Sequence, residues 1–274
     1  MSRAKAFHAE LDFALDCVRQ AGEQIRAIAS SYDVVHKGDG SLVTTADLQI
    51  NEWFVEQAAE QFPGDRVLGE ELSSDAGGPR TWVIDPLDGT LQFVLGIPVW
   101  MVAIALTDED GRPVLAVAHN PSLRAGSGSM YWAIDEGGAF RDGEPIRVST
   151  RDGSAIPAWI RGEATECLSD ALSGTLMEVA FAPRMKAIER RVLPAVFACC
   201  LVAEGSLDGV LYTGSGAHDL AAGCLMVREA GGLVTDLAGA EQRYDAPVNG
   251  GALSNGLIHG ALLQQRAAGD GCGR

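Results

Sequence analysis

Two carboxylates stand three residues apart at the end of a short apolar run, and they define the chemistry that this chain could perform. The run, residues 82–84, reads as a buried strand, and Asp85 and Asp88 follow it with Pro86 between them. Because proline lacks a backbone N–H and fixes φ, we expect the strand to stop there. Residues 88–90 then predict the start of a turn or helix, whose free N–H groups can bind an anion.

This short loop therefore offers ligands for a divalent cation beside donors for a phosphate. Mg²⁺ in proteins is usually bound by a few carboxylates together with phosphate oxygens of the substrate. An aspartate-rich turn after a strand is the structural alternative, because Asp, Pro and Gly are all common turn residues. Residues 82–90 alone leave both interpretations open.

Two further aspartates begin predicted helices. Asp47 follows Thr44 and Thr45, either of which can cap a helix, and Asp219 follows the glycine-rich residues 213–216. The helix dipole stabilises an acid in the first turn, which is a sufficient structural reason for each aspartate. The functional alternative is a carboxylate that is fixed on a rigid element and directed at the 82–90 loop.

Glu70 and Glu71 end a short predicted strand at residues 66–71. Adjacent side chains on an extended chain point to opposite sides, so we expect only one of the pair to face a site while the other supports it. Together the acids form an all-oxygen set, which favours Mg²⁺, Mn²⁺ or Ca²⁺ over zinc. Brought close together, they would repel one another without a cation.

The sequence shows no motif for zinc binding, for a catalytic serine triad or for nucleotide binding. No Cys and His residues have zinc spacing, and no Ser-His-Asp arrangement or nucleophile elbow is present. No P-loop or Rossmann fingerprint follows a strand. His218 stands next to Asp219, but a solitary histidine is more often a surface or hydrogen-bonded residue, and we assign it no chemistry.

Composition and charge narrow the class of partner. The chain has 274 residues, of which 47% are hydrophobic and 21% charged, as in a globular protein with a large core. Its net charge of −16 argues against a nucleic acid polymer or an anionic membrane as partner. A phosphate ester would also be repelled unless a bound cation reversed the local field, so phosphate chemistry here requires a metal.

The sequence also indicates a compartment. No apolar run approaches the ~20 residues that span a bilayer, and the N-terminus lacks the apolar region of a signal peptide. The six cysteines show no C-x-x-C pair and are most simply reduced thiols. We therefore expect a cytoplasmic protein.

The first half reads as two helices followed by a largely antiparallel sheet. Apolar residues at helical spacing predict helices over residues 8–29 and 44–58, and residues 34–41 predict a flexible loop or solvated hairpin. Residues 108–112 predict a turn between two strands. The predicted strands are 66–71, 82–84, 97–106, 114–118, 130–134, 138–140 and 146–149.

The second half alternates between helix and strand, which predicts a further layered unit. Helices are expected at 166–172, 190–204, 217–230 and 258–267, and strands at 156–160, 176–181, 208–212 and 232–235. We divide the chain into an α+β half, 1–150, with Lys37, Asp47, Glu70 and the 85–90 loop, and an α/β half, 151–274, with Asp219. No Pro/Ser-rich linker separates them, so the halves should pack tightly.

Four motifs, in this order, make the chain resemble the inositol monophosphatase family. They are Lys37-x-Asp39-x-Ser41-x-Val43-Thr44-x-Ala46-Asp47, then Gly69-Glu70-Glu71, then the 82–90 stretch, then Asp219-Leu220-Ala221-Ala222-Gly223 with Glu229-Ala230-Gly231-Gly232. The family includes histidinol phosphatases, 3′-phosphonucleotide phosphatases and some fructose-1,6-bisphosphatases. The resemblance implies a layered αβαβα sandwich, the sugar phosphatase fold of inositol monophosphatases, and Mg²⁺-dependent hydrolysis of a small phosphomonoester.

The resemblance also implies roles for individual residues. Glu70, Asp85 and the Leu87 carbonyl would hold one metal ion, and Asp85, Asp88 and Asp219 a second, in a site for two or three Mg²⁺ ions that could also accept Mn²⁺. Thr90 and Asp47 would hold and deprotonate the attacking water, with Glu70 assisting. The substrate would be bound by the backbone of Gly89 and Thr90 and by Lys37, Ala195 and Tyr212.

Three departures from the family pattern affect the choice of substrate. Leu193-Pro194 stands where Gly-Ser or Gly-Thr is usual, His218 replaces a tryptophan, and Tyr212 replaces a glutamate that grips sugar hydroxyls in inositol phosphatases. An inositol or related polyol or sugar phosphate, histidinol phosphate and a 3′-phosphonucleotide therefore remain open as substrates. A non-catalytic metal- or phosphate-binding relative is the alternative from another class. Dimers are common in the family, and the apolar second half permits one.

Overall fold

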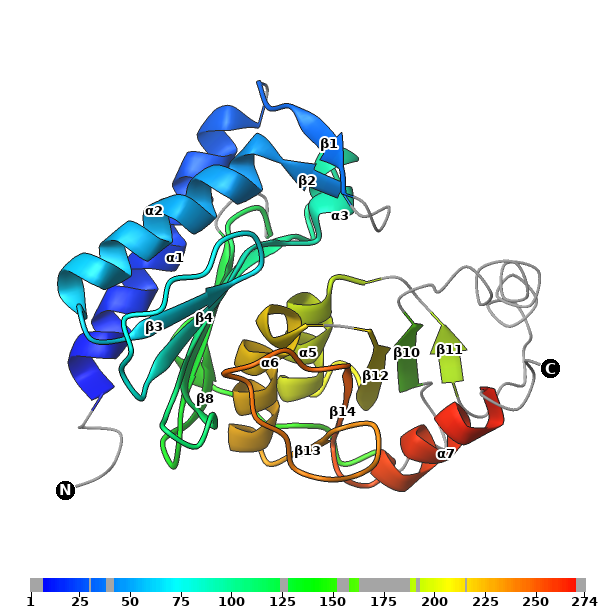
Figure 1. The fold of residues 1–274 in the computed structure, drawn as a ribbon. Helices are drawn as coiled ribbons and strands as arrows, with labels where there is room; N and C mark the ends of the chain where they lie inside the picture. Colours follow the sequence, from blue (N-terminus) through cyan, green and yellow to red (C-terminus); the bar gives the residue numbers. More distant parts are fainter. Residues whose placement is uncertain are drawn as a thin grey trace.

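Two sheets and three layers of helices alternate through the molecule in the order α, β, α, β, α (Figure 1). The computed structural model describes residues 7–29, 31–37, 42–123, 128–151, 158–162, 188–190, 193–214 and 216–269. The predicted helix at 166–172 and strand at 176–181 lie outside these residues. The layered αβαβα sandwich is therefore the fold that the resemblance implied.

The first two layers come from the first half of the chain. Helices α1 (His8–Ile28) and α2 (Thr45–Gln61) cover one face of a seven-stranded sheet, and the short strands β1 (Val34–His36) and β2 (Leu42–Thr44) form an antiparallel pair. In the large sheet β3 and β4 are parallel and every other pair is antiparallel. In spatial order its strands are β3 (Arg66–Gly69), β4 (Thr81–Asp88), β5 (Met101–Thr107), β6 (Pro113–Asn120), β7 (Ser129–Ile134), β8 (Gly138–Arg141) and β9 (Glu144–Pro145).

The two faces of this sheet carry side chains of different size. Residues alternate between the faces along β5, so Val102, Ile104 and Leu106 pack toward α1 and α2. Ala103 and Ala105 pack toward the other face with further alanines from β6 to β8. Small side chains allow a helix to approach the sheet closely, and α6 (Ala217–Glu229) lies directly against this alanine face.

The remaining layers come from the second half of the chain. Helices α5 (Ala195–Ala203) and α6 lie between the large sheet and a five-stranded sheet of mixed direction, and α7 (His259–Gly269) covers that sheet from outside. One hydrophobic core joins residues of β4 to β8 with residues of α5 and α6, so both halves of the chain contribute to it. The five strands, in spatial order, are β11 (Ile188–Arg190), β10 (Ala158–Gly162), β12 (Gly209–Thr213), β14 (Gly251–Ser254) and β13 (Leu233–Thr235).

Several predicted boundaries were wrong. The strand does not stop at Pro86: β4 continues to Asp88 through a register shift that places the proline in a bulge. The helix expected from residue 190 begins at Ala195 after Pro194, and residue 190 ends β11. Residues 146–149 are not a strand, and β5 begins at Met101 instead of residue 97. Among the described residues no helix combines the length and apolarity needed to cross a membrane.

Candidate active site

A bulge in β4 brings Asp85 and Asp88 to the same end of the sheet. Asp85 pairs with Ala103 of β5 and Asp88 pairs with Met101, so three steps on β4 correspond to two on β5. A proline in the bulge costs no ladder hydrogen bond, which explains why Pro86 is tolerated. The Oδ1 atom of Asp85 accepts a 3.0 Å hydrogen bond from the Leu87 N–H, which orients its carboxylate.

Gly89 reverses the chain between the bulge and the short helix α3 (Thr90–Val94). Its φ is +92°, a conformation that favours glycine. A Cβ atom at this position would also lie 2.6 Å from Cγ of Pro194, so the proline ring packs directly over Gly89. The departure at Leu193-Pro194 therefore lies against the loop that the resemblance assigns to phosphate binding.

Asp47 lies in the first turn of α2 and has contacts on both oxygens. Thr44 caps the helix, and Oδ2 of Asp47 accepts hydrogen bonds from the Thr44 N–H at 2.7 Å and hydroxyl at 2.5 Å. Oδ1 accepts a 3.0 Å hydrogen bond from the Thr90 hydroxyl. That hydroxyl also lies 3.2 Å from the Leu87 carbonyl oxygen. The structure thus brings Asp47, Thr90 and the metal loop together across 43 residues of sequence.

Asp219 and Asp88 are oriented by backbone N–H groups. Gly216, the N-cap of α6, donates to Oδ2 of Asp219 at 2.9 Å. The N–H of Phe197 in α5 donates to Oδ2 of Asp88 at 3.0 Å. Both helices therefore help to position the cluster, and the Phe197 contact carries no sequence signal because it comes from the backbone.

Glu70 and Glu71 both reach the site, contrary to the prediction that only one would. They follow Gly69 in a bend instead of continuing an extended strand, so the alternation of a strand does not apply. Lys37 donates to Oε1 of Glu70 at 2.8 Å and also forms an ion pair with Glu71. Burial would lower the pKa of Lys37, but these two carboxylates raise it and keep the ammonium charged.

Asn51 holds this bend, and the sequence analysis did not identify it. Its Oδ1 accepts hydrogen bonds from the N–H groups of Glu71 at 3.0 Å and Leu72 at 3.3 Å, and its Nδ2 donates to the Leu72 carbonyl at 2.8 Å. Asn51 is fully buried one turn after Asp47 on α2. The i, i+4 spacing from Asp47 places both on one helix face and could have revealed it.

The carboxylates form two adjoining groups of three. Ligand oxygens of Asp85, Asp88 and Asp219 lie within 4.8 Å of one another, and so do those of Asp47, Glu70 and Glu71. Burial and then repulsion by Glu70 and Asp88 raise the pKa of Asp85 well above its ordinary value. Burial is also the main cause of the raised pKa values of Glu70 and Asp47.

Such a cluster fits a divalent cation. Buried carboxylates that repel one another are unfavourable without a compensating positive charge, and within the part of the chain that the structure describes Lys37 pairs with the two glutamates and not with the aspartates. Both groups consist of oxygen donors, the ligands of hard cations such as Mg²⁺. The residues present therefore fit the metal that the sequence predicted.

The other predicted site residues differ in how far they are buried. His218 is partly exposed, with Nε2 3.6 Å from Oδ2 of Asp219. Tyr212 and Ala195 are brought together, because the Tyr212 hydroxyl donates to the Ala195 carbonyl at 3.2 Å. Both are completely buried in this conformation, so they present no surface to a substrate and would act only by supporting the site.

The five-layer sandwich and its acidic cluster define the class of metal-dependent phosphatases with this fold. The profile of the Inositol monophosphatase family matches residues 8–269, and the chain belongs to this family. It is therefore a phosphatase of the phosphoric monoester hydrolase type.

Relatives of known name and structure agree with this assignment. "Inositol monophosphatase 3" of Solanum lycopersicum is 32% identical over 266 residues, covering 93% of this chain and 95% of the relative. "Histidinol-phosphatase" of Mycobacterium tuberculosis is 34% identical over 279 residues, covering 96% and 99%. Among solved structures, a Thermotoga maritima IMPase superposes with a TM-score of 0.79 at 29% identity, covering 93% of this chain and 96% of that one.

Proposed function

We propose that this protein is a Mg²⁺-dependent phosphomonoesterase that hydrolyses a small polyol or sugar phosphate, such as an inositol monophosphate. The observation that carries the proposal is the convergence of Asp85, Asp88 and Asp219 within 4.8 Å. The hydrogen bond from Thr90 to Asp47 lies beside them. This proximity supports a role for the three aspartates as metal ligands and for Thr90 and Asp47 as the pair that holds an attacking water.

In this proposal the acidic residues of the cluster hold two metal ions. Glu70, Asp85 and the Leu87 carbonyl would hold one cation, and Asp85, Asp88 and Asp219 a second. Bound Mg²⁺ would supply positive charge that lowers the pKa of water and neutralises charge on the phosphoryl group.

The residues around the cations would then position the reactants. The Thr90 hydroxyl would hold the attacking water, and Asp47 would receive its proton directly or through Thr90, with Glu70 assisting. The backbone N–H groups of Gly89 and Thr90, at the reversal of the chain, would bind phosphate oxygens. Lys37 would add a positive charge at the edge of the site.

Histidinol phosphate is the second candidate substrate. The Mycobacterium tuberculosis relative named histidinol-phosphatase is as similar to this chain as the inositol monophosphatases and covers more of it. In addition, buried Tyr212 stands where the resemblance places a glutamate that grips sugar hydroxyls. Without that carboxylate, a substrate with fewer hydroxyl groups is easier to accommodate.

The test is release of phosphate with Mg²⁺ from inositol 1-phosphate, histidinol phosphate, fructose 1,6-bisphosphate and 3′-phosphoadenosine 5′-phosphate. We expect one ester to be preferred and hydrolysis to require the metal. Hydrolysis of histidinol phosphate alone would replace the polyol proposal by the second candidate. Binding of Mg²⁺ without release from any ester would favour a non-catalytic relative.

Asp88→Asn tests the metal assignment directly. The amide keeps an oxygen for the Phe197 N–H, so the fold should survive, but the ligand charge is lost. We expect Mg²⁺-dependent turnover to fall by about 10² or more, since a metal site supplies several kcal/mol of transition-state stabilisation. Unchanged turnover at saturating Mg²⁺ would contradict the assignment.

Location and assembly belong to the same proposal. Four cysteines in the described residues, Cys17, Cys199, Cys200 and Cys224, are buried free thiols, which is consistent with a reducing cytoplasm. Leu91, Leu95 and Ile97 expose apolar side chains on and after α3, and such a group suits a homodimer contact. Measurement of the mass in solution would test the dimer.

A further inference from the structure

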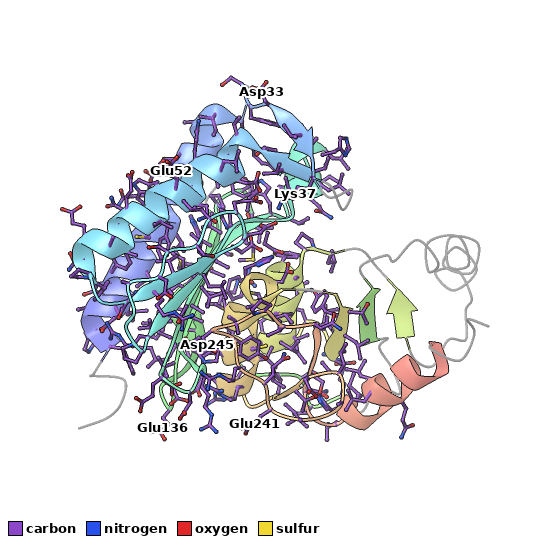
Figure 2. All side chains as sticks on the ribbon, in the orientation of Figure 1. Asp33, Lys37, Glu52, Glu136, Glu241 and Asp245 are labelled. Carbon is purple, nitrogen blue, oxygen red and sulfur yellow. The ribbon has the colours of Figure 1, made fainter. Side chains whose placement is uncertain are left out.

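Helix α7 covers the outer face of the five-stranded sheet, away from the acidic cluster. Figure 2, in the orientation of Figure 1, places Lys37, beside that cluster, far from this helix. In the described part of the chain, α7 and the turn before it pack on the sheet through a small hydrophobic cluster, in which Ile258 and Leu262 join Leu211 and Ala252. The helices of the other layers belong to two larger cores, so α7 has the smallest apolar anchor.

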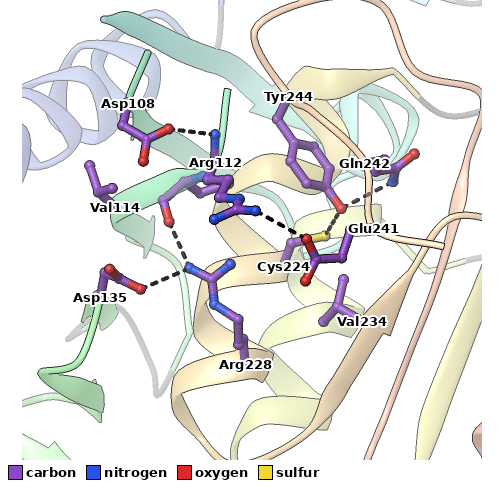
Figure 3. Close-up of a pocket in the computed structure, with 11 residues that line it drawn as sticks. Asp108, Arg112, Val114, Asp135, Cys224, Arg228, Val234, Glu241, Gln242 and Tyr244 are labelled. Atoms are coloured by element: carbon purple, nitrogen blue, oxygen red, sulfur yellow. Dashed lines mark hydrogen bonds and ion pairs between the residues drawn. The ribbon is translucent and has the colours of Figure 1, made fainter. Parts of the chain in front are cut away.

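Strand β13 lies between the interior of the molecule and α7. Val234 points inward and lines the cavity beside α6 that Figure 3 shows. Thr235, the next residue, points outward to α7, because successive side chains of a strand lie on opposite faces. Ser254 of β14 shares this outer face, since it follows Ala252 of the hydrophobic cluster by two residues. The sheet therefore presents two hydroxyl groups to the start of α7.

His259, the first residue of α7, joins these two hydroxyl groups. Only 4% of the residue is exposed. Its Nε2 lies 2.9 Å from Oγ1 of Thr235, and its Nδ1 lies 2.9 Å from Oγ of Ser254. No other described side chain of α7 makes a hydrogen bond to the sheet, so the imidazole is the polar anchor of this helix.

The hydrogen bonds around the ring of His259 assign its tautomer. The Thr235 hydroxyl donates to the Asp236 carbonyl at 2.8 Å, so the Thr235 oxygen accepts the Nε2–H. The neutral ring then accepts the Ser254 hydroxyl at Nδ1, and the Ser254 oxygen accepts the Gly256 N–H at 3.0 Å. Each hydrogen in this chain thus has one acceptor. Protonation would turn Nδ1 into a donor and deprive the Ser254 hydroxyl of the acceptor that it has in the neutral form.

Burial also disfavours the charged ring. It lowers the pKa of His259 below the ordinary 6.5 and is the only cause of this shift. The elements packed against α7 carry two charged groups next to their strand ends. They are Asp236 after β13, whose carboxylate accepts two N–H groups of its own turn, and Asp208 before β12, which pairs with Arg151.

The sign of the pH dependence follows from this lowered pKa. When α7 detaches, the ring of His259 enters water and binds a proton more readily than in the closed structure. The stability that the neutral ring contributes is therefore present above pH 6.5 and is lost as the pH falls below that value. Acid thus favours the detached helix.

We propose that His259 is an acid-sensitive latch, which holds α7 on the sheet while its ring is neutral and releases the helix locally when the ring is protonated. Release uncovers Leu211 on the outer face of β12. The opposite face of β12 carries Tyr212, whose hydroxyl donates to Ala195 at the start of α5. The opening therefore reaches the strand that supports the candidate active site, but the latch itself does not depend on the proposed catalytic function.

The test is hydrogen exchange of the backbone amides of α7, measured by mass spectrometry at about pH 7.5 and about pH 5.5 with Mg²⁺ present and corrected for the intrinsic exchange rate. We expect the protection of α7 to fall about threefold or more at the lower pH, while that of α1 stays the same. His259→Gln keeps a donor and an acceptor for the two hydroxyl groups but does not titrate. Its α7 should therefore have the same protection at both pH values.

Two further variants separate the latch from general effects. His8→Gln makes the same change at an exposed position on α1 and should keep the pH effect on α7. Thr235→Val keeps the shape of the side chain but removes the acceptor for Nε2–H, and should lower the protection of α7 about fivefold at pH ~7.5. The proposal is overturned if α7 of the unaltered protein is equally protected at both pH values or if His259→Gln retains the pH effect. It is also overturned if α1 loses protection to the same extent as α7, which would mean that the whole protein opens.

Discussion

Asp47 combines two roles that the sequence presented as alternatives. One carboxylate oxygen completes the cap of α2 and the other accepts the Thr90 hydroxyl, so a helix-capping acid is also a member of the candidate site. The capping contacts hold the side chain in one orientation before any substrate binds. A residue of this type gives the same local signal whether or not it serves chemistry, and only the position of Thr90 distinguishes the cases.

Substitution of Asn51 should show whether this residue positions Glu70 for metal binding or only supports the fold. Asn51→Ala removes three partly buried hydrogen bonds from the bend that carries Glu70, and the N–H groups of Glu71 and Leu72 lose their acceptor. We expect a loss of about 1–3 kcal/mol of stability. We also expect a higher Mg²⁺ concentration for half-maximal activity, because Glu70 loses its fixed position. Denaturant unfolding and Mg²⁺ titration of turnover measure the two effects.

Gln49→Ala is the matched control for this substitution. Gln49 lies on α2 two residues from Asn51 but is exposed, so both stability and Mg²⁺ dependence should stay close to those of the unaltered protein. Asn51→Asp keeps an acceptor for the two N–H groups but adds a negative charge near Glu70. A variant Asn51→Ala that lost stability while keeping the same Mg²⁺ dependence would show a purely structural role.

At the scale of helices and strands, the sequence predicted the elements whose own residues carry a clear apolar pattern. Helices α1 and α6, the β5–β6 hairpin and the acidic strand end of β4 were all found from periodicity and turn residues. The resemblance correctly implied the layer order, which these local patterns do not contain. Roles assigned to individual site residues stay predictions, although the structure places Asp47, Thr90 and the metal-loop acids together.

The errors have tertiary causes. Pro86 does not end β4 because a bulge removes the need for its N–H. Strand β14, Gly-Ala-Leu-Ser, has no β-branched residue and exists because β12 and β13 pair with it on both sides. The bend after Gly69 depends on Asn51 of another element. Such contacts between distant segments leave little trace in one sequence.

The contact between α5 and α6 gives a prediction at this scale. A Cβ atom on Gly223 of α6 would lie 2.3 Å from Cβ of Cys199 of α5, so Gly223→Ala must separate the two helices. We expect a loss of about 1–3 kcal/mol, as for other overpacked cores. Phe197 on α5 orients Asp88 and α6 carries Asp219, so the Mg²⁺ requirement should also rise.

Gly260→Ala provides the comparison for Gly223→Ala. Gly260 lies in α7, and a Cβ atom there meets nothing within 4 Å. Its replacement should leave stability unchanged or raise it by up to ~1 kcal/mol, the helix preference of alanine over glycine. Thermal unfolding of both variants decides the question, and equal stability of the two would show that α5 and α6 can separate without cost.

At the scale of the whole molecule, the charge of −16 and the acidic cluster lead us to expect that stability depends on cations. The folded-state pKa of Asp85 lies well above its ordinary 3.8, and those of Glu70 and Asp47 are also raised. Above pH 3.8 the folded state therefore holds more protons than the unfolded state. The contribution of these acids to stability then falls as the pH rises through the folded-state pKa values.

A bound divalent cation reverses this dependence, because it requires the ionised acids. We expect the gain in Tm on adding Mg²⁺ to be larger at about pH 7.5 than at about pH 5. The corresponding gain in unfolding free energy should approach ~2.7 kcal/mol at a hundredfold excess of Mg²⁺ over Kd. Burial lowers the pKa values of His119 and His259, so these histidines oppose the trend in the metal-free protein. The informative quantity is therefore the difference in stability, at each pH, between the unaltered protein and the Asp85→Asn variant.

Asp85→Asn removes the most perturbed acid while an oxygen remains for the Leu87 N–H. Without metal, this variant should be more stable than the unaltered protein at about pH 7.5, by a margin that shrinks toward about pH 4, where the unfolded carboxylate itself becomes protonated. With Mg²⁺ the order should reverse, since the variant has lost a ligand. Asp12→Asn, at an exposed position on α1, makes the same chemical change and should alter neither comparison. A metal-free Asp85→Asn protein less stable than the unaltered one at every pH would mean that the cluster is held together by contacts of its own and not by the cation we propose.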